Sequence, residues 1–348
     1  MSILAVAAMS AISCEKIASL EDNVASIDGI RFNAPVIIEE ALESDDTKVC
    51  IKNYAANGRP NYAWQAGDAI NIWSYDIPDT WEDAQLTDWG KFTTADDNAT
   101  SATFRGNIPA TPTSGYYLVF FSNCDANPVL EKHATRGRYN IKTNIPAVQD
   151  GTGIPYCFFA ARPKSFNSGT KSFTFEAIND VSTANTSQTA YGCSFALRNN
   201  LTKFRIPVFS TEGKKINRID ITLSYSKGAT QYLASNGSAR DFTLSSQNFY
   251  PGGGGSTTVT VYKGGVALPE EILFACRGTE GNTTRGYAIL NFVFTNVNGE
   301  TATAEIKLKD KSVDDITANN QCKNLSPYGR MTYIGDFGAA GLSESSFK

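Results

Sequence analysis

Short runs in which apolar and polar residues alternate recur along most of the chain, whereas helical periodicity is scarce. Alternation with a period of two is typical of a strand that has one buried face. Clusters of Gly, Asn, Asp, Ser and Pro separate the runs, as turns between strands require. The runs predicted as strands are Ile30–Ala34, Ala69–Trp73, Tyr116–Phe121, Lys171–Phe175, Lys203–Val208, Ile219–Leu223, Thr257–Tyr262, Ala288–Phe294 and Ala302–Leu308.

The dipeptide Asn298-Gly299 separates the last two runs and is the strongest hairpin signal in the chain. Because both residue types tolerate positive φ, a type I′ turn is predicted here. No run is followed by an amphipathic helical pattern, which argues against a parallel sheet built from βαβ units. The predicted fold class is all-β, with two antiparallel β-sandwich domains in tandem, of transthyretin-like or Greek-key type.

The 348 residues exceed what a single core usually supports, so two domains are expected. The polar stretch 179–190 (NDVSTANTSQTA) falls near the middle and is the best boundary. The predicted domains are therefore residues 28–180 and 190–348. A hydrophobic fraction of 41% fits ordinary globular domains. The net charge of −4 contains no basic excess, which argues against nucleic acid as a partner.

Residues 1–13 (MSILAVAAMSAIS) are apolar and uncharged, and Cys14 follows them directly. The stretch is too short to span a bilayer, so a signal peptide is predicted. A cysteine at this place resembles the lipobox of bacterial lipoproteins, which implies an acylated Cys14 and a flexible lipidated tether at residues 14–27. The alternative is a buried N-terminal helix with an incidental cysteine.

The remaining cysteines favour a structural role over a chemical one. None of them has C-x-x-C spacing, so zinc binding and thioredoxin-like redox chemistry are not expected. Several lie within apolar runs, where cysteine behaves as a small core residue, although an even number in an exported chain would also permit three disulfides. We expect mostly free, buried thiols at Cys50, Cys124, Cys157, Cys193, Cys276 and Cys322.

The sequence contains few candidates for catalytic residues. The one histidine, His133, lies in a charged stretch that is predicted to be an exposed loop, so imidazole catalysis finds no support. Acidic residues cluster in predicted loops, where they are ordinarily solvated, and only their separation in space could mark a glycosidase pair. We therefore expect no enzyme, no cofactor and no metal site. These acidic residues include Glu82, Asp83, Asp96 and Asp97.

Trp81 and Trp89 stand out because they fall in a polar, acidic segment, Asp79–Trp89 (DTWEDAQLTDW), which is predicted to be a loop. Two interpretations are open. Exposed tryptophans can stack on sugars or anchor a partner, which makes both residues candidate ligand-stacking sites. Alternatively, they are lid residues that cover an otherwise open end of a sandwich.

Five phrases along the chain occur in an order that carries a family resemblance. They are Trp64–Ile72 (WQAGDAINI), Ala102–Ile108 (ATFRGNI), Tyr116–Phe120 (YYLVF), Ile145–Gln149 (IPAVQ) and Ser194–Ile206 (SFALRNNLTKFRI). Together they resemble motifs of the fimbrillin-like proteins of Bacteroidales, which are subunits and accessory lipoproteins of type V fimbriae. The resemblance covers about residues 28–225. Within the first phrase, Gly67-Asp68 also suits a turn that enters a strand.

The resemblance implies a lipoprotein precursor that is carried to the outer membrane. There a trypsin-like protease removes an N-terminal strand, and a strand of a neighbouring subunit fills the vacated groove by β-strand addition. In this chain the first strand would be about Gly29–Glu39, and Lys48 or Arg59 would be the basic residue at the processing site. Without cleavage, the chain would be an anchor or tip subunit.

The resemblance also implies a donor strand near the C-terminus. Met331–Phe337 is the best β-rich segment there, and the small, polar tail Gly338–Lys348 need not pack on its own domain. The predicted function is a structural, tip or accessory subunit of a cell-surface fimbria that contributes to adhesion. Its expected partners are other fimbrial subunits, the outer membrane through the lipid on Cys14, and a host protein or glycan. The alternative is a monomeric surface glycan-binding lipoprotein that uses Trp81 and Trp89.

Overall fold

The computed structural model describes the body of the chain as strands and short turns. Within the described residues there is no α-helix, and no helix is long and apolar enough to cross a membrane. The predicted all-β fold class is therefore confirmed. The described residues are 29–33, 39–40, 53–54, 60–61, 64–97, 99, 101–122, 127–152, 156, 158–174, 196–197, 199–234, 242–244, 249–251, 254–278, 285–308 and 331–348.

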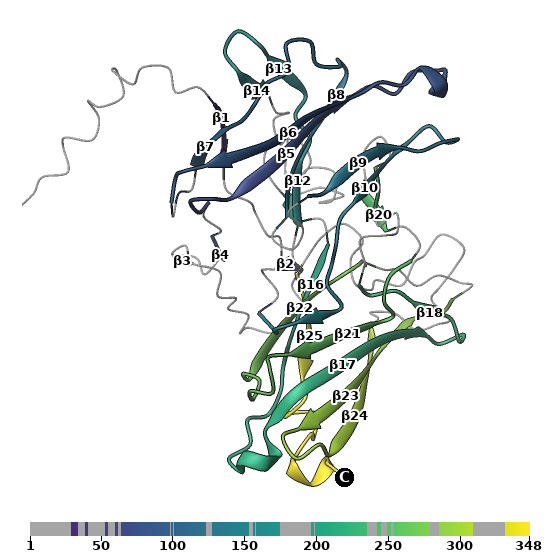
Figure 1. Ribbon diagram of the computed structural model, residues 1–348. Helices are drawn as coiled ribbons and strands as arrows, with labels where there is room; N and C mark the ends of the chain where they lie inside the picture. Colours follow the sequence, from purple (N-terminus) through teal and green to yellow (C-terminus); the bar gives the residue numbers. More distant parts are fainter. Residues whose placement is uncertain are drawn as a thin grey trace, which may run out of the picture.

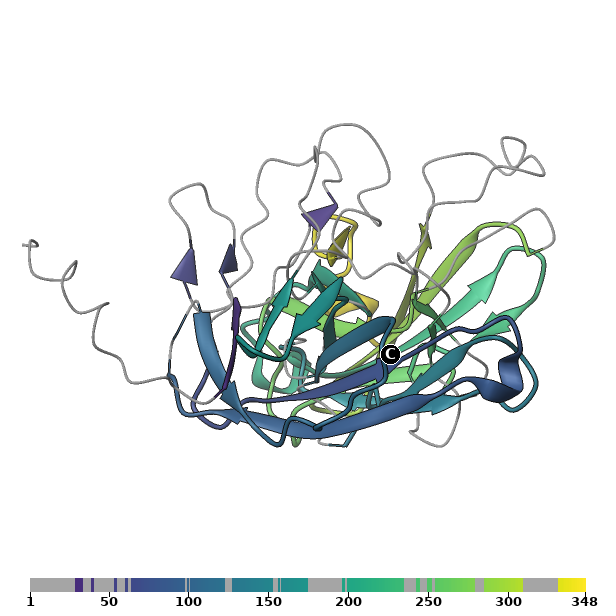
Figure 2. The ribbon, with the colours of Figure 1, turned by 90° about the horizontal axis from the view of Figure 1, so that it is seen from above.

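The N-terminal half is built on a seven-stranded antiparallel sheet, which forms the upper part of the molecule in Figure 1. In the view from above, its blue strands run side by side as one long, curved layer (Figure 2). Its core is rich in aromatic side chains, and Trp64 and Trp73 are almost fully buried there. In sheet order the strands are β1 (Ile30–Asn33), β7 (Ser101–Arg105), β6 (Leu86–Thr94), β5 (Ala69–Tyr75), β8 (Tyr116–Ser122), β12 (Phe158–Ala161) and β15 (Ala196–Leu197).

The C-terminal half is built on a six-stranded sheet with a second core beneath one face. From Ile219 to Tyr225 its central strand β17 alternates between buried and less buried residues, which is the pattern that the sequence predicts over Ile219–Leu223. In sheet order the strands are β11 (Val148–Gln149), β21 (Thr258–Tyr262), β17 (Ile216–Tyr225), β23 (Ala288–Asn296) and β24 (Thr301–Leu308), and β18 (Thr230–Gln231) also pairs with β17.

A four-stranded sheet lies between the two cores. Its strands are β2 (Glu39–Glu40), β25 (Met331–Asp336), β16 (Asn200–Arg205) and β22 (Glu271–Cys276). Leu201 and Leu273 belong to the N-terminal core, whereas Phe204 and Phe274 belong to the C-terminal core. Because successive residues of a strand point to opposite faces, β16 and β22 hold both cores together.

A second four-stranded sheet also takes strands from both halves: β20 (Phe249–Pro251), β19 (Phe242–Leu244), β10 (Tyr139–Lys142) and β9 (Val129–Lys132). Two hairpins complete the described elements: β13 (Ser165–Asn167) with β14 (Ser172–Thr174), and β3 (Asn53–Tyr54) with β4 (Pro60–Asn61). The predicted boundary at 179–190 lies outside the described residues and stays a prediction. Sheets that draw on both sides of it join the halves more closely than a simple tandem would.

The structure differs from the prediction in strand direction and in one turn. Strand β25 runs parallel to both β2 and β16, and β11 runs parallel to β21. The hairpin at Asn298-Gly299 is present, but only Gly299 has positive φ, at 83°. Gly299 N donates to Asn296 O, and Asn296 N donates to Glu300 O. This is a type I turn closed by a glycine bulge, so the type I′ prediction is wrong.

Candidate assembly interface

The predicted first strand begins as an edge strand of the N-terminal sheet. Strand β1 pairs antiparallel with β7, with Ile30 opposite Phe104 and Phe32 opposite Ala102. Ile30 is 1% exposed and Phe32 is 3% exposed, whereas Arg31 between them is exposed. The alternation of Ile30, Arg31 and Phe32 therefore directs two large apolar side chains into the core, as the sequence predicts.

Phe32 is held by both its ring and its backbone. Its ring lies 6.0 Å from that of Phe104 and 5.9 Å from that of Phe173. The indole Nε1 of Trp64 donates a hydrogen bond of 3.1 Å to the carbonyl oxygen of Phe32. Burying an apolar side chain of this size contributes roughly 1.5–3 kcal/mol. Strand β1 is therefore an integral part of the core, although it lies at the edge of the sheet.

The same N-terminal segment reaches a second sheet. Strand β2 pairs in parallel with β25, with Glu39 opposite Met331 and Glu40 opposite Thr332. It is the edge strand on that side of the sheet between the two cores. Residues 34–38, between the two strands, lie outside the described residues. A single segment of the chain thus covers an edge of two different sheets.

The C-terminal segment is an interior strand. Strand β25 lies between β2 and β16, and a bulge interrupts its register with β16 between Lys203 and Arg205. Phe337 follows β25 directly and is 3% exposed. Its ring lies 4.7 Å from that of Phe292 and 5.0 Å from that of Phe294. β25 therefore ends in an aromatic anchor inside its own half of the molecule.

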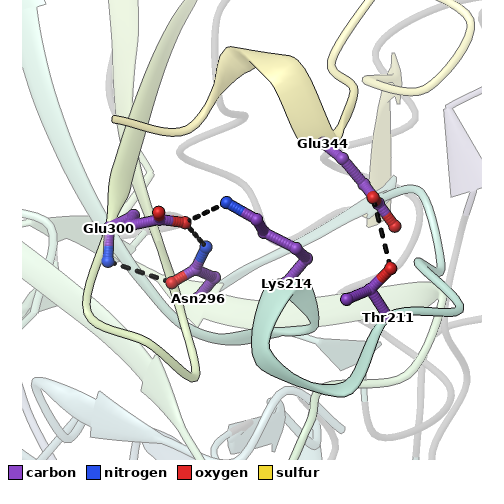
Figure 3. A network of polar contacts seen from close by, with 5 residues as sticks. All are labelled: Thr211, Lys214, Asn296, Glu300 and Glu344. Carbon is purple, nitrogen blue, oxygen red and sulfur yellow. Dashed lines mark hydrogen bonds and ion pairs between the residues drawn. The ribbon is translucent and has the colours of Figure 1, made fainter.

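A network of polar contacts lies beside the tail that follows, and Figure 3 shows the five residues that form it. Glu300 accepts hydrogen bonds from Lys214 Nζ at 2.6 Å and from Asn296 Nδ2 at 2.7 Å. Hydrogen bonds from Lys214 and Asn296 lower the pKa of the Glu300 carboxyl, because they favour its charged form. Beside this group, Thr211 Oγ1 donates a hydrogen bond of 3.3 Å to Glu344 in η6 (Glu344–Ser346), the short 3₁₀ helix of the tail.

The end of the tail also packs on its own half. Phe347 is 6% exposed, and its ring meets that of Phe209 edge to face at 5.8 Å. Lys348 and Thr301 exchange two backbone hydrogen bonds, of 3.0 and 3.1 Å. The prediction that Gly338–Lys348 need not pack on its own domain is therefore wrong. Phe337 and Phe347, both in the last twelve residues, make apolar contacts that the otherwise small and polar composition of this segment does not indicate.

Beside β25, the structure places an ion pair between a buried lysine and a half-buried glutamate, which the sequence does not single out. Lys203 Nζ lies 2.9 Å from Glu271 Oε2, and the Lys203 side chain is only 1% exposed. In the sheet Lys203 is opposite Tyr333 of β25. Burial raises the pKa of the Tyr333 hydroxyl, and the nearby Asp336 adds to the effect. A charged residue in the middle of an apolar strand is the sequence signal for such a pair.

Gln149, the last residue of the IPAVQ phrase, is a second residue whose role becomes clear only in the structure. Its side-chain Nε2 donates to Ala275 O at 2.7 Å, and its Oε1 accepts from Ala275 N at 2.8 Å. The amide side chain thus pairs with β22 as a neighbouring strand would. This bond ties a segment of the N-terminal half to the sheet between the cores.

Trp81 is a buried residue of the N-terminal core. It opens the short 3₁₀ helix η2 (Trp81–Asp83) and is 9% exposed. Its Nε1 donates to the carbonyl oxygen of His133 at 2.6 Å, and its ring meets that of Tyr139 edge to face at 5.1 Å. The Lys132 ammonium lies over the ring, 5.3 Å from its centroid. Protein groups therefore occupy the positions that a stacked sugar would need.

Trp89 lies in strand β6, so the prediction of a loop over Asp79–Trp89 is wrong at its end. The side chain is 4% exposed, stacks on Phe173 at 5.7 Å and meets Phe166 edge to face at 4.8 Å. Its Nε1 donates to Ser74 Oγ at 3.0 Å. Trp81 and Trp89 are both covered in this conformation, as the lid interpretation requires, and their role as ligand-stacking residues stays a prediction.

The prediction of a solvated His133 is also wrong. The residue follows β9 directly and is 6% exposed. The imidazole Nδ1 accepts a hydrogen bond of 3.1 Å from Thr135 N, and the backbone N–H of His133 donates to Arg138 O at 3.0 Å. The charged neighbours in the sequence belong to a tight loop that folds back over the imidazole.

Of the remaining residues that the sequence singles out, the structure describes Cys276 but not Cys14, Lys48 or Arg59. Cys276 is a free, buried thiol, as expected, and burial raises its pKa to about 12. The predicted lipidation site Cys14 and the predicted processing sites Lys48 and Arg59 lie outside the described residues. They remain predictions. Arg59 immediately precedes β4 in the sequence.

Comparisons with known proteins give distant structural likenesses. No family model and no curated protein matches the chain. A candidate cell adhesion protein from Bacteroides uniformis is 11% identical, with a TM-score of 0.39 over 83% of this chain and 91% of that one. Another, from Bacteroides ovatus, is 13% identical, with a TM-score of 0.34 over 80% and 86%. The pilus 2b backbone protein of group B streptococcus is 12% identical, with a TM-score of 0.20 over 83% and 88%. These values do not establish a family.

Proposed function

We propose that this chain is a structural, tip or accessory subunit of a cell-surface fimbria, that it assembles by β-strand exchange, and that it contributes to adhesion. One observation carries the proposal: the segment Ile30–Glu40 supplies an edge strand to two sheets, as β1 and as β2. Cleavage after Lys48 or Arg59 would cut the covalent connection of both strands at once. The fimbrillin-like motifs of the sequence support the same assignment.

Loss of the segment would leave two vacancies that favour a replacement strand. The ladder groups of β7 that pair with β1 would become unpaired, and the sites of Ile30 and Phe32 would fill with water. An edge with free N–H and C=O groups is a template for another chain. Two buried side chains at roughly 1.5–3 kcal/mol each, together with the backbone pairing, would make refilling in trans favourable.

The donor in this proposal is an extended strand of a neighbouring subunit. For β25 to act as that donor, its sheet would have to release an interior strand and Phe337 would have to leave its aromatic cluster. We therefore propose that the C-terminal segment is held in its own subunit until it meets a vacant groove. A lipid on Cys14 would keep the uncleaved precursor at the outer membrane, and a host protein or glycan would be the adhesion ligand.

The experiment combines trimming with a competing peptide. A trypsin-like protease is added to the purified protein and to a variant with Lys48→Gln, Lys52→Gln and Arg59→Gln, which has no basic residue left in this stretch, and assembly is followed on non-reducing gels. We expect ladders from the wild type and only monomer from the variant. A synthetic peptide of Gly29–Glu39 should suppress the ladders by refilling the groove beside β7.

The matched control is the same peptide with Ile30→Asp and Phe32→Asp, which cannot enter an apolar core and should not inhibit. Trimmed protein that stays monomeric at high concentration would contradict strand exchange. Equal inhibition by both peptides would contradict the groove beside β7 as the site of exchange. Retention in the detergent phase that is lost on Cys14→Ala would separately support the lipid anchor.

A further inference from the structure

Strand β24 (Thr301–Leu308) is an edge strand that another chain can reach. It is the last strand of the six-stranded sheet, and β23 is its one strand partner within the described part of the chain. Figure 1 shows it on the outer side of β23. At eight residues it is long for an edge strand, and native proteins usually shorten or cover such edges.

The backbone groups that face outward can be identified from the tail. Thr301 and Lys348 exchange their N–H and C=O groups, so those of Thr301 point away from β23. Every second residue of a strand points its backbone groups to the same side. The N–H and C=O groups of Thr303, Glu305 and Lys307 therefore also point away from β23.

The side chains along this edge are charged on one face and apolar on the other. Glu305 and Lys307 lie on the solvent face, with side chains that are 58% and 57% exposed. Ala304 and Ile306 point to the opposite face, where they are half-buried against the C-terminal core. A strand added here would cover Ile306 on the core face. On the solvent face its side chains would lie beside the charges of Glu305 and Lys307.

We propose that a second copy of this chain pairs antiparallel with β24 about a two-fold axis at Ile306. In this register Glu305 lies opposite Lys307 of the second copy, and Lys307 lies opposite its Glu305. The two positions exchange four backbone hydrogen bonds, because the outward-facing groups of both strands meet. The two Ile306 side chains face each other on the core side, where the copies complete one continuous sheet.

Charge selects this register among those that the backbone allows. Residues whose backbone groups point outward must lie opposite residues of the second copy whose backbone groups also point outward. A two-fold axis through any residue of the strand meets this condition, so the backbone alone does not fix the register. An axis at Glu305 would oppose two carboxylates, and an axis at Lys307 would oppose two ammonium groups. An axis at Ala304 would bring Lys307 opposite Thr301, whose outward groups already pair with Lys348. Among the described residues of β24, only the axis at Ile306 places Glu305 opposite Lys307 in both directions and keeps these pairs clear of Thr301.

This contact differs from strand exchange. It uses an edge of the C-terminal half, whereas β1 and β2 are edges of other sheets, and it needs no cleavage. It would join subunits side by side, which a strand donated from one subunit to the next does not do. The uncleaved full chain should therefore dimerise by itself.

The test is sedimentation equilibrium of the uncleaved full chain across a range of concentrations. Glu305→Lys or Lys307→Glu turns both cross-strand attractions into repulsions, so each should weaken the dimer by about tenfold or more. The double variant, Glu305→Lys with Lys307→Glu, rebuilds both pairs and should dimerise within roughly threefold of the wild type. Glu212→Lys makes the same charge change at a side chain that is 77% exposed and outside this edge, and should have no effect.

A cross-link gives a second measurement that does not depend on charge. Facing residues in a non-hydrogen-bonded pair have Cα atoms about 4.5 Å apart, so Ile306→Cys should form an intermolecular disulfide on oxidation. Ala304→Cys, which would face Leu308 of the second copy, should not exceed the wild-type background of the native cysteines. The proposal is overturned if the wild type is monomeric at every concentration or if the double variant is as weak as the single ones. It is equally overturned if the amides of Thr303, Glu305 and Lys307 are already protected from hydrogen exchange in the dilute monomer.

Discussion

Phe337→Ala should destabilise both halves of the molecule, although it alters a side chain in only one of them. Phe337 closes β25, and its backbone N–H donates to Arg205 O at 3.0 Å. Its ring is 3% exposed and lies within 5.5 Å of Phe204, as well as against Phe292 and Phe294. Truncation to alanine removes the ring from the centre of this cluster and leaves the backbone bond in place.

The expected loss is about 3–5 kcal/mol, because truncation of a buried phenylalanine combines lost transfer free energy with a cavity. The upper part of this range applies here, since three edge-to-face or tilted ring pairs are lost together and each adds about 0.5–1.5 kcal/mol. A domain typically has about 5–15 kcal/mol of stability in total. The variant should therefore fold, with a clearly lower unfolding midpoint.

Urea unfolding followed by two signals measures this effect. All four tryptophans lie between residues 64 and 89, so their fluorescence reports on the N-terminal half, whereas far-ultraviolet circular dichroism reports on both. Because β16 and β22 contribute to both cores, both transitions should move to lower urea. Val293→Ala, at a side chain that is 38% exposed, is the control and should change the stability by less than about 0.5 kcal/mol. A loss below about 1 kcal/mol for Phe337→Ala, or a fluorescence transition that does not move, would refute the reasoning.

Three further predictions concern single sites. Gly106→Ala should destabilise the chain by about 1–3 kcal/mol in thermal unfolding, because a Cβ there would lie 2.5 Å from Cγ of the buried Phe92; an unchanged melting temperature would show that Phe92 moves aside freely. Glu300 has a pKa below its ordinary value of 4.5 in the folded state, so its bond to Lys214 stabilises the fold above that pH and is lost as the pH falls through the folded pKa. Glu300→Gln should therefore lower the melting temperature at about pH 7, and this difference should shrink as the pH falls; a difference that does not change with pH would contradict the assignment. The Cys276 thiol, with a pKa of about 12, should resist alkylation in the native protein and react only in urea, as peptide mass spectrometry can show; rapid native labelling would disprove its burial.

Local alternation predicts the strands that have one face in a core. Ile30 and Phe32 point inward as their spacing requires, and β17 alternates from Ile219 to Tyr225. Gly67-Asp68 forms the predicted turn: Gly67 has a φ of 92°, and Asp68 Oδ2 accepts from Gln65 N at 2.8 Å. These features depend on residues close in the sequence, which is why the sequence alone is sufficient.

Features that depend on distant contacts could not be predicted in this way. Trp89 and His133 lie in polar stretches, and only the fold brings Phe173 and Trp81 against them. Strand β11 has two residues, too few for any periodicity, and it exists because β21 pairs with it. The tail packs because Phe347 contacts Phe209, which precedes it in the sequence by more than a hundred residues.

The candidate interface is predictable to a similar degree. The segment Gly29–Glu39 is recognisable as the first strand from its composition, and β1 confirms the beginning of that prediction. That the same segment continues as β2 beside β25 is a property of the tertiary fold, because parallel pairing leaves no local turn signal.

Hydrogen exchange at the backbone amides of Ala102 and Phe104 in β7, which lie opposite Phe32 and Ile30 of β1, tests the central claim most directly. The account predicts that these amides are protected in the intact chain, lose protection when the N-terminal segment is removed, and regain it when trimmed subunits assemble. Protection that does not change on trimming, or assembled subunits in which β7 remains exposed, would contradict strand exchange at this edge.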